Sequence, residues 1–200
     1  ATYGELKVLL KDKLKNRVAK DDEVYFYFSG HGVPTNDGES YLLLNDSDPS
    51  NPKISAYPMK ELYEDLGGLK TTKSYAFLDT CFSGGTGRTD KVDTLLEGTR
   101  PGVMKVNDIS LAYDNLVIFT ATDKNQLSNS YKEQNHGLFT YYMLKGMGGE
   151  ADKDNNKNIS LDELQSYIKD NVSRESSKLG NTKIQQPLLK TTVDRNSYIY

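Results

Sequence analysis

The chain has 200 residues, 36% hydrophobic and 26% charged, which is enough for one globular domain with its own core. Its net charge of −3 argues against nucleic-acid binding, and no apolar run approaches the ~18 residues that span a bilayer. We therefore expect a soluble protein that binds neither nucleic acid nor membrane, and its one cysteine gives no indication of compartment.

Helix and strand patterns alternate along the chain, which is typical of an α/β fold. Apolar residues recur with a period near 3.6 over residues 5–18, so this segment is predicted to be an amphipathic helix. Further helices are predicted at 58–66, 137–149 and 160–172, and strands at 24–28, 40–46, 73–81, 115–123 and 184–192. Because the central runs are apolar at consecutive positions, we predict one domain over residues 1–200, a three-layer sandwich with a mostly parallel central sheet.

The single cysteine lies in the segment AFLDTCFSGG, just past a predicted strand. The segment FSGHG places His31 just past another predicted strand. The carboxyl ends of neighbouring parallel strands meet at one crevice, so His31 and Cys81 should face each other if their strands are neighbours. An imidazole there can accept the proton of a thiol whose pKa is otherwise about 8.5. The pair therefore predicts nucleophilic catalysis, with Gly-flanked amides available to stabilise an oxyanion.

Other interpretations compete with this one. A cysteine after an apolar strand is often a small buried hydrophobic residue, and a histidine in a Gly-flanked turn can be an ordinary loop residue. The segment CFSGGTGR is also similar to the C-x5-R phosphate loop of cysteine-dependent phosphatases. However, six residues rather than five separate Cys81 from Arg88, and that motif leaves FSGHG unexplained.

The chain resembles the caspase-like cysteine peptidases, closest to the bacterial metacaspase-type branch, in the ordered segments FSGHG, LDTCFSGG, ATDKNQLSNS, HGLFTYYMLKGM and QQPLLKTT. The resemblance covers essentially the whole chain. It implies a caspase-hemoglobinase fold and hydrolysis of peptide bonds by a Cys-His dyad, with no cofactor in the chemical step. His31 and Cys81 match the dyad positions, and the amides of Gly32 and Cys81 match the oxyanion hole.

The resemblance also implies a substrate preference. Asp79 matches the acid that lines the primary specificity pocket and pairs with Arg or Lys in metacaspase-like enzymes. A carboxylate beside the nucleophile could hold a guanidinium through two hydrogen bonds. The alternative is that Asp79 only caps the following turn. The expected partner is a protein or peptide with a basic residue at the cleavage site.

A long segment at 85–113 lacks any clear periodicity, and loops of this length inside a domain are often functional. It lies where caspases are processed between their large and small subunits. It also offers basic residues at Arg88, Lys91, Arg100 and Lys105. The sequence therefore suggests the hypothesis that the chain cleaves itself within this processing-type loop.

The family fold begins with a strand, a helix and a strand that precede the helix predicted at 5–18, and this chain lacks them. We therefore expect an N-terminally incomplete catalytic domain: either the chain is a fragment or a processed product, or the missing piece is a separate polypeptide. One candidate partner is accordingly a separate N-terminal fragment of the same precursor. Without that piece the sheet would have an exposed interior edge.

A second motif lies at 152–163. Asp152, Asp154, Asn156, Asn158, Ser160 and Glu163 occupy positions 1, 3, 5, 7, 9 and 12 of an EF-hand-like loop, spaced to supply oxygen ligands to Ca²⁺. Lys157 stands at position 6, where Gly normally permits the sharp turn. The loop is thus either a weak structural Ca²⁺ site or a solvated turn that caps the next helix.

These observations favour a cysteine endopeptidase that cleaves after Arg or Lys. The alternatives are a catalytically silent caspase-like module that binds peptides or acts as a scaffold, and a calcium-responsive interaction domain centred on 152–163.

Overall fold

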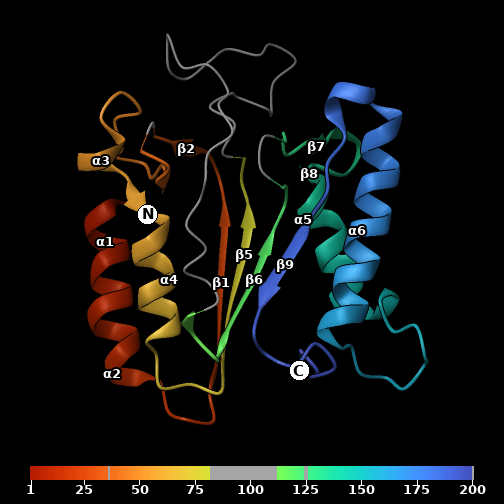
Figure 1. Ribbon diagram of the computed structural model, residues 1–200, viewed down its shortest axis with the longest axis horizontal. Helices are drawn as coiled ribbons and strands as arrows, with labels where there is room; N and C mark the ends of the chain where they lie inside the picture. Colours follow the sequence, from red (N-terminus) through yellow and green to blue (C-terminus); the bar gives the residue numbers. More distant parts are fainter. Residues whose placement is uncertain (36, 82–111, 124–125, 200) are drawn as a thin grey trace.

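A four-stranded sheet in the order β1-β5-β6-β9 forms the centre of the molecule (Figure 1). The computed structural model describes residues 1–35, 37–81, 112–123 and 126–199. Strands β1 (Glu23–Ser29), β5 (Lys73–Asp79) and β6 (Leu116–Thr120) are parallel, and β9 (Leu188–Thr191) runs antiparallel to β6. The mostly parallel α/β architecture predicted from the sequence is confirmed.

One face of the sheet is covered by the N-terminal helix and by α4 (Met59–Gly67) (Figure 1). The N-terminal helix begins with α1 (Tyr3–Val8), continues through the π-helical turn η1 (Leu9–Leu14) and ends in α2 (Lys15–Arg17). The side chain of Thr2 caps its first turn by accepting a hydrogen bond from the amide of Glu5. The buried core on this side includes Leu6, Leu10, Leu62, Leu66, Ala76, Leu78, Leu116 and Ile118.

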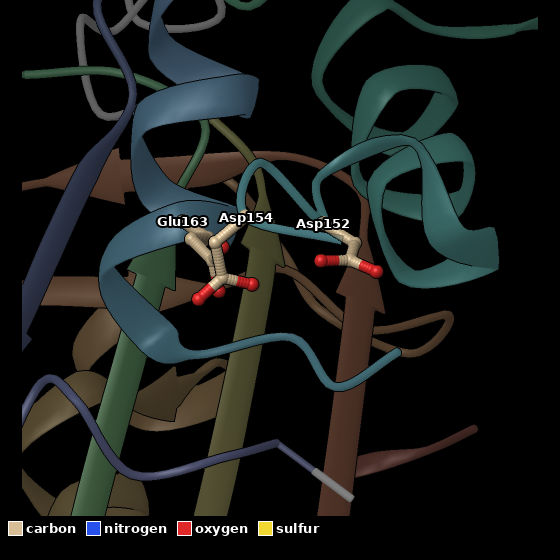
Figure 2. Close-up of side chains that lie close together, drawn as sticks. All are labelled: Asp152, Asp154 and Glu163. Carbon is tan, nitrogen blue, oxygen red and sulfur yellow. The ribbon is translucent and has the colours of Figure 1, made fainter. Parts of the chain in front are cut away.

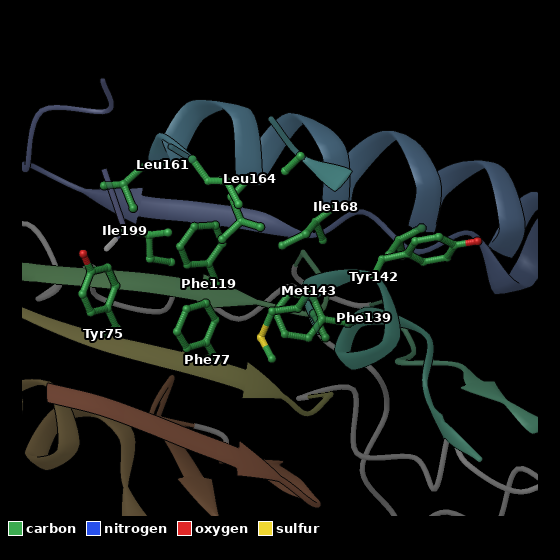
Figure 3. Packing of buried hydrophobic residues seen from close by; sticks show 14 of the residues in the cluster. Tyr75, Phe77, Phe119, Phe139, Tyr142, Met143, Leu161, Leu164, Ile168 and Ile199 are labelled. Atoms are coloured by element: carbon green, nitrogen blue, oxygen red, sulfur yellow. The ribbon is translucent and has the colours of Figure 1, made fainter. Parts of the chain in front are cut away.

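The other face is covered by α5 (Leu138–Lys145) and α6 (Leu161–Lys178) (Figures 1 and 3). Phe77 of β5 and Phe119 of β6 are register partners, and their rings stack with centroids 5.1 Å apart. A π-helical turn, η4 (Gly146–Glu150), ends the α5 segment at Gly149, whose φ of 116° favours a residue without a Cβ. The side chains of α6 that reach this core are Leu161, Leu164, Ile168 and Val172.

Short elements surround the carboxyl ends of the parallel strands (Figure 1). They are β2 (Gly32–Pro34), β3 (Ser40–Leu42), α3 (Pro52–Ser55), β4 (Tyr57–Pro58), β7 (Ser130–Tyr131), η3 (Lys132–Gln134), β8 (His136–Gly137) and η5 (Asn181–Lys183). Pro58 is the N-cap of α4 and not, as predicted, its first residue, because its backbone is extended and pairs with Tyr41 of β3.

The C-terminal segment ties the start of α6 to the amino ends of the parallel strands. Ile199 donates its amide hydrogen to the carbonyl of Ile159 at 2.9 Å, and its own carbonyl accepts from the hydroxyl of Tyr25 on β1. Within the described ranges, no helix has the length and apolar character needed to cross a membrane.

Candidate active site

The carboxyl ends of β1 and β5 lie side by side in parallel register. Pairing runs from Glu23 opposite Lys73 to Ser29 opposite Asp79. The amide of Gly30 extends the pairing by donating to the carbonyl of Asp79 at 3.3 Å. His31 lies two residues beyond Ser29 and Cys81 two residues beyond Asp79. The register therefore places both predicted catalytic residues just past equivalent positions on adjacent strands.

His31 occupies the bend between β1 and β2. Its carbonyl accepts a hydrogen bond from the amide of Leu43 at 2.9 Å, which fixes the bend to the β2–β3 hairpin. A Cβ on Gly30 would come within 2.6 Å of the Phe28 ring, so the tight bend before His31 requires glycine or a shift of that ring. Gly32, the predicted oxyanion donor, is buried at the start of β2.

Cys81 follows β5, whose residues from Ser74 to Asp79 are all buried. β5 lies between β1 and β6, and the carbonyl of Leu78 near its end accepts from the amide of Ala121 at 2.9 Å. The Cys81 side chain is 5% exposed and forms no disulfide. Hydrogen bonds thus hold the backbone of β5 as far as Asp79, two residues before the thiol.

Asp79 is fully buried and receives two hydroxyl hydrogen bonds. Ser128 Oγ donates to Asp79 Oδ1 at 2.6 Å, and Thr140 Oγ1 donates to Asp79 Oδ2. Gly137 lies against the same carboxylate, since a Cβ there would collide with Oδ2. Sequence reasoning assigned no role to Ser128, Gly137 or Thr140. A buried acid requires hydrogen-bond donors, but the sequence does not identify residues 49 and 61 positions away as those donors.

The EF-hand-like loop brings three of its predicted ligands together. Asp152, Asp154 and Glu163 each offer a carboxylate oxygen, and these oxygens lie within 4.8 Å of one another (Figure 2). The amide of Lys157 donates to Asp152 Oδ2 at 2.9 Å, so the loop folds back over its first residue. Carboxylate oxygens in this arrangement suit a hard cation such as Ca²⁺.

The other predicted members of the loop take part in hydrogen bonds within it. Asn156 Nδ2 donates to Asp154 Oδ2 at 2.9 Å, and Asn158 Nδ2 donates to the carbonyl of Asn156 at 3.1 Å. Ser160 caps α6, and its amide and hydroxyl lower the pKa of Glu163 below its usual value. Glu163 is therefore ionised at neutral pH, as a calcium ligand must be.

Residue Lys157 adopts a left-handed backbone with a φ of 68°. This conformation is the one that glycine provides at position 6 of an EF-hand loop. For a residue with a Cβ it costs about 1–2 kcal/mol. The loop thus keeps the EF-hand turn although Lys157 replaces glycine at position 6, and the backbone of Lys157 is strained.

The predicted processing loop at 85–113 lies outside the described residues except for its last two positions.

The family model of the caspase domain matches residues 2–198. The chain belongs to the caspase-domain family. Members of this family are cysteine peptidases that act on protein substrates and use no cofactor in catalysis.

Solved structures share the caspase-domain fold. Protein GSU0716 from Geobacter sulfurreducens matches with a TM-score of 0.59 at 19% identity, over 97% of this chain and 75% of that one. Caspase-1 from Spodoptera frugiperda matches with a TM-score of 0.55 at 14% identity, over 98% of this chain and 69% of that one. At these identities the likeness shows a common fold. No curated protein matches the chain in sequence.

Proposed function

We propose that the chain is a cysteine endopeptidase in which His31 and Cys81 form the catalytic dyad. The observation that carries the proposal is the register of β1 and β5, in which Ser29 lies opposite Asp79. Adjacent strands are about 4.8 Å apart, so the segments that follow Ser29 and Asp79 start side by side, which favours proton transfer between His31 and Cys81.

The proposed reaction follows from this placement. His31 accepts the thiol proton while the sulfur of Cys81 attacks the substrate carbonyl carbon. The amides of Gly32 and Cys81 stabilise the oxyanion of the tetrahedral intermediate. The C–N bond then breaks, and His31 donates its proton to the leaving amine. Water hydrolyses the resulting thioester, releasing the acid and restoring the thiol.

We infer a preference for Arg or Lys before the cleaved bond, with Asp79 as the acid that recognises it. Asp79 is the last residue of β5 and precedes Cys81 by only two residues, so its carboxylate belongs to the segment next to the nucleophile. The carboxylate is shielded from water, which strengthens an ion pair formed there.

Self-processing within 85–113 belongs to the same proposal, since Arg88, Lys91, Arg100 and Lys105 provide basic cleavage points. Incubation of the wild type beside Cys81→Ala tests it. New fragments ending at these residues should form only in the wild type. Identical intact masses in both samples would rule out self-cleavage.

We also propose that a strand from a separate N-terminal fragment of the same precursor pairs with β1. Among the described strands, β1 is flanked on one side only, by β5, and Tyr25 and Tyr27 on it are 44% and 49% exposed. Edge strands are usually protected by charge, Pro or short length, and the run YFYF at 25–28 has none of these. A groove of about 440 Å³ between this strand and η1 is lined by Leu9, Leu10, Leu14, Val18 and 22–26.

Hydrogen exchange tests this partner. The amides of β1 should exchange more slowly in protein purified together with the N-terminal fragment than in residues 1–200 alone. Equal exchange in the two samples would contradict the pairing.

We further propose that Asp152, Asp154 and Glu163 bind a structural Ca²⁺, with Asn156 and the carbonyl of Asn158 completing the set of ligands. The three converging carboxylates and the lowered pKa of Glu163 support this assignment. The ion would brace the turn before α6 and take no part in the chemical step.

Turnover of fluorogenic peptides ending in Arg, Lys or Asp, with and without EDTA, tests the main proposal. The wild type should cleave the Arg and Lys peptides, and Cys81→Ala should cleave none. Absence of turnover in both proteins would contradict the peptidase and favour the catalytically silent module. Activity that disappears with EDTA and returns with Ca²⁺, without a change in circular dichroism or melting temperature, would indicate a regulatory rather than a structural ion.

A further inference from the structure

The carboxylate of Asp79 is held by two hydroxyl groups from separate parts of the chain. Ser128 Oγ, before β7, donates to Oδ1 at 2.6 Å, and Thr140 Oγ1, in α5, donates to Oδ2. The Asp79 side chain is 0% exposed. Hydrogen bonds to an ionised group are about twice as strong as neutral ones, so the plane of this carboxylate is fixed from both ends.

Thr140 connects Asp79 to the neighbouring strand. Its hydroxyl also lies 2.9 Å from the hydroxyl of Tyr27 on β1. A threonine hydroxyl has one hydrogen to donate, and Thr140 donates it to Asp79. Tyr27 must therefore be the donor to Thr140, and the hydrogen bonds run in one direction from β1 through α5 to the end of β5.

Ser128 is fixed by its neighbour. The amide of Asn129 donates to Gln185 Oε1 at 2.8 Å, and Gln185 Nε2 donates to the carbonyl of Ala121, just past β6, at 2.9 Å. Gln185 is fully buried. The backbone that carries Ser128 is thus anchored to the central sheet, and its hydroxyl has little freedom to leave Asp79.

We propose that Ser128 and Thr140, the latter supported by Tyr27, are positioning residues that orient the Asp79 carboxylate for the guanidinium of a substrate arginine. The inference rests on the proposed function and adds to it a discrimination between Arg and Lys. A guanidinium pairs with a carboxylate through two parallel hydrogen bonds, which require a set orientation of the carboxylate plane. An ammonium acts as a point charge and tolerates a rotated carboxylate. Loss of either hydroxyl therefore weakens recognition of Arg more than recognition of Lys.

Affinity labelling of Cys81 tests the positioning role of Ser128 and Thr140 without requiring turnover. Three peptidyl chloromethyl ketones of the same sequence, ending in Arg, Lys or norleucine, are reacted with the wild type, Ser128→Ala, Thr140→Val and Thr140→Ser. The thiolate displaces chloride, and because the chain has one cysteine, the mass increase that is absent from Cys81→Ala treated in parallel reports labelling at Cys81. Iodoacetamide, which has no side chain to recognise, measures the reactivity of the thiol itself in each protein.

The wild type should label fastest with the Arg reagent and slowest with the norleucine reagent. Ser128→Ala and Thr140→Val should each slow the Arg reagent by about tenfold, the scale expected for a hydrogen bond to a charged group, and should reduce the Arg-to-Lys ratio. Thr140→Ser keeps the hydroxyl, so its Arg-to-Lys ratio of labelling rates should lie within about twofold of the wild-type ratio. Iodoacetamide rates should change little in any variant.

Three different results would overturn the inference. If the wild type prefers Arg but Ser128→Ala and Thr140→Val keep its Arg-to-Lys ratio, the two hydroxyls do not orient the carboxylate and the proposed preference for basic residues stands. If the wild type labels equally fast with Arg and norleucine, the basic preference fails and the positioning role fails with it. A parallel loss with every reagent, iodoacetamide included, would assign these residues to stability alone.

Discussion

Ser29 at the end of β1 lies directly opposite Asp79 at the end of β5, and the amide of Gly30 donates to the Asp79 carbonyl. This relationship sets the positions of the residues that follow. His31 and Cys81 each come two residues later, so a shift of one residue in the register would move one of them away from the other. The packing that holds this register is therefore as important to the proposed chemistry as the two residues themselves.

The packing of α5 against the sheet offers a matched pair of substitutions in one helix. Phe139 is fully buried in the core beneath α5 and α6, whereas Leu144 is 51% exposed. Phe139→Ala should lower the free energy of unfolding by about 3–5 kcal/mol, because it removes an aromatic ring and leaves a cavity. Leu144→Ala should change it by less than about 1 kcal/mol. Urea denaturation of both variants measures the difference, and equal losses would contradict this packing of α5.

Lys157→Gly should stabilise the chain, because glycine adopts the left-handed backbone of Lys157 without steric cost. The expected gain is about 1 kcal/mol, since the greater freedom of glycine in the unfolded chain offsets part of the relief. Asn155→Gly is the control, because asparagine already tolerates its φ of 61°. A melting temperature that falls in Lys157→Gly would show that the lysine conformation is not strained.

Calcium should raise the melting temperature of the wild type, since a ligand that binds only the folded state stabilises it. Glu163→Gln removes one of the three clustered carboxylates and should abolish this shift. Asp162→Asn removes a neighbouring charge outside the cluster and should keep it. Differential scanning fluorimetry with Ca²⁺ and with EDTA measures both. A wild-type melting temperature that does not change in millimolar Ca²⁺ would contradict the calcium site and favour a solvated turn that caps α6.

The lowered pKa of Glu163 predicts how stability depends on pH. Hydrogen bonds from Ser160 favour the ionised form, so the pKa in the folded chain lies below the ordinary value of 4.5. The ionised group stabilises the fold above its unfolded pKa, and this contribution is lost as pH falls through the folded pKa. In calcium-free buffer, the wild type should lose stability between about pH 5 and pH 3 more steeply than Glu163→Gln. Parallel curves would indicate that the hydrogen bonds between Ser160 and Glu163 contribute nothing to stability in solution.

The long elements of this fold can be predicted from the sequence because each carries a clear period or a continuous apolar run. The helix predicted at 5–18 and the strands predicted at 73–81 and 115–123 all occur, and the candidate strand at 184–192 is the antiparallel edge strand β9. The strand predicted at 40–46 occurs as the three-residue β3, which pairs with β2 and β4 outside the central sheet. Strands β2, β4, β7 and β8 were not predicted, because strands of two or three residues are too short to show alternation.

The candidate site shows the same limit. His31, Cys81 and Asp79 stand in recognisable segments at strand ends, so the sequence identifies them as candidates. The hydroxyls of Ser128 and Thr140 reach Asp79 only because β7, β8 and α5 fold over the end of β5. Contacts between residues so distant in sequence depend on the tertiary fold, and no local pattern indicates them.

The central claim, that His31 activates the thiol of Cys81, is tested most directly by the alkylation rate of that thiol. The chain has one cysteine and two histidines, so iodoacetamide labels a single site and His136→Asn is a matched control for His31→Asn. At about pH 6.5, where an ordinary thiol is largely protonated, the wild type and His136→Asn should react at similar rates. His31→Asn should react at least about tenfold more slowly. Equal rates in all three proteins would contradict the dyad.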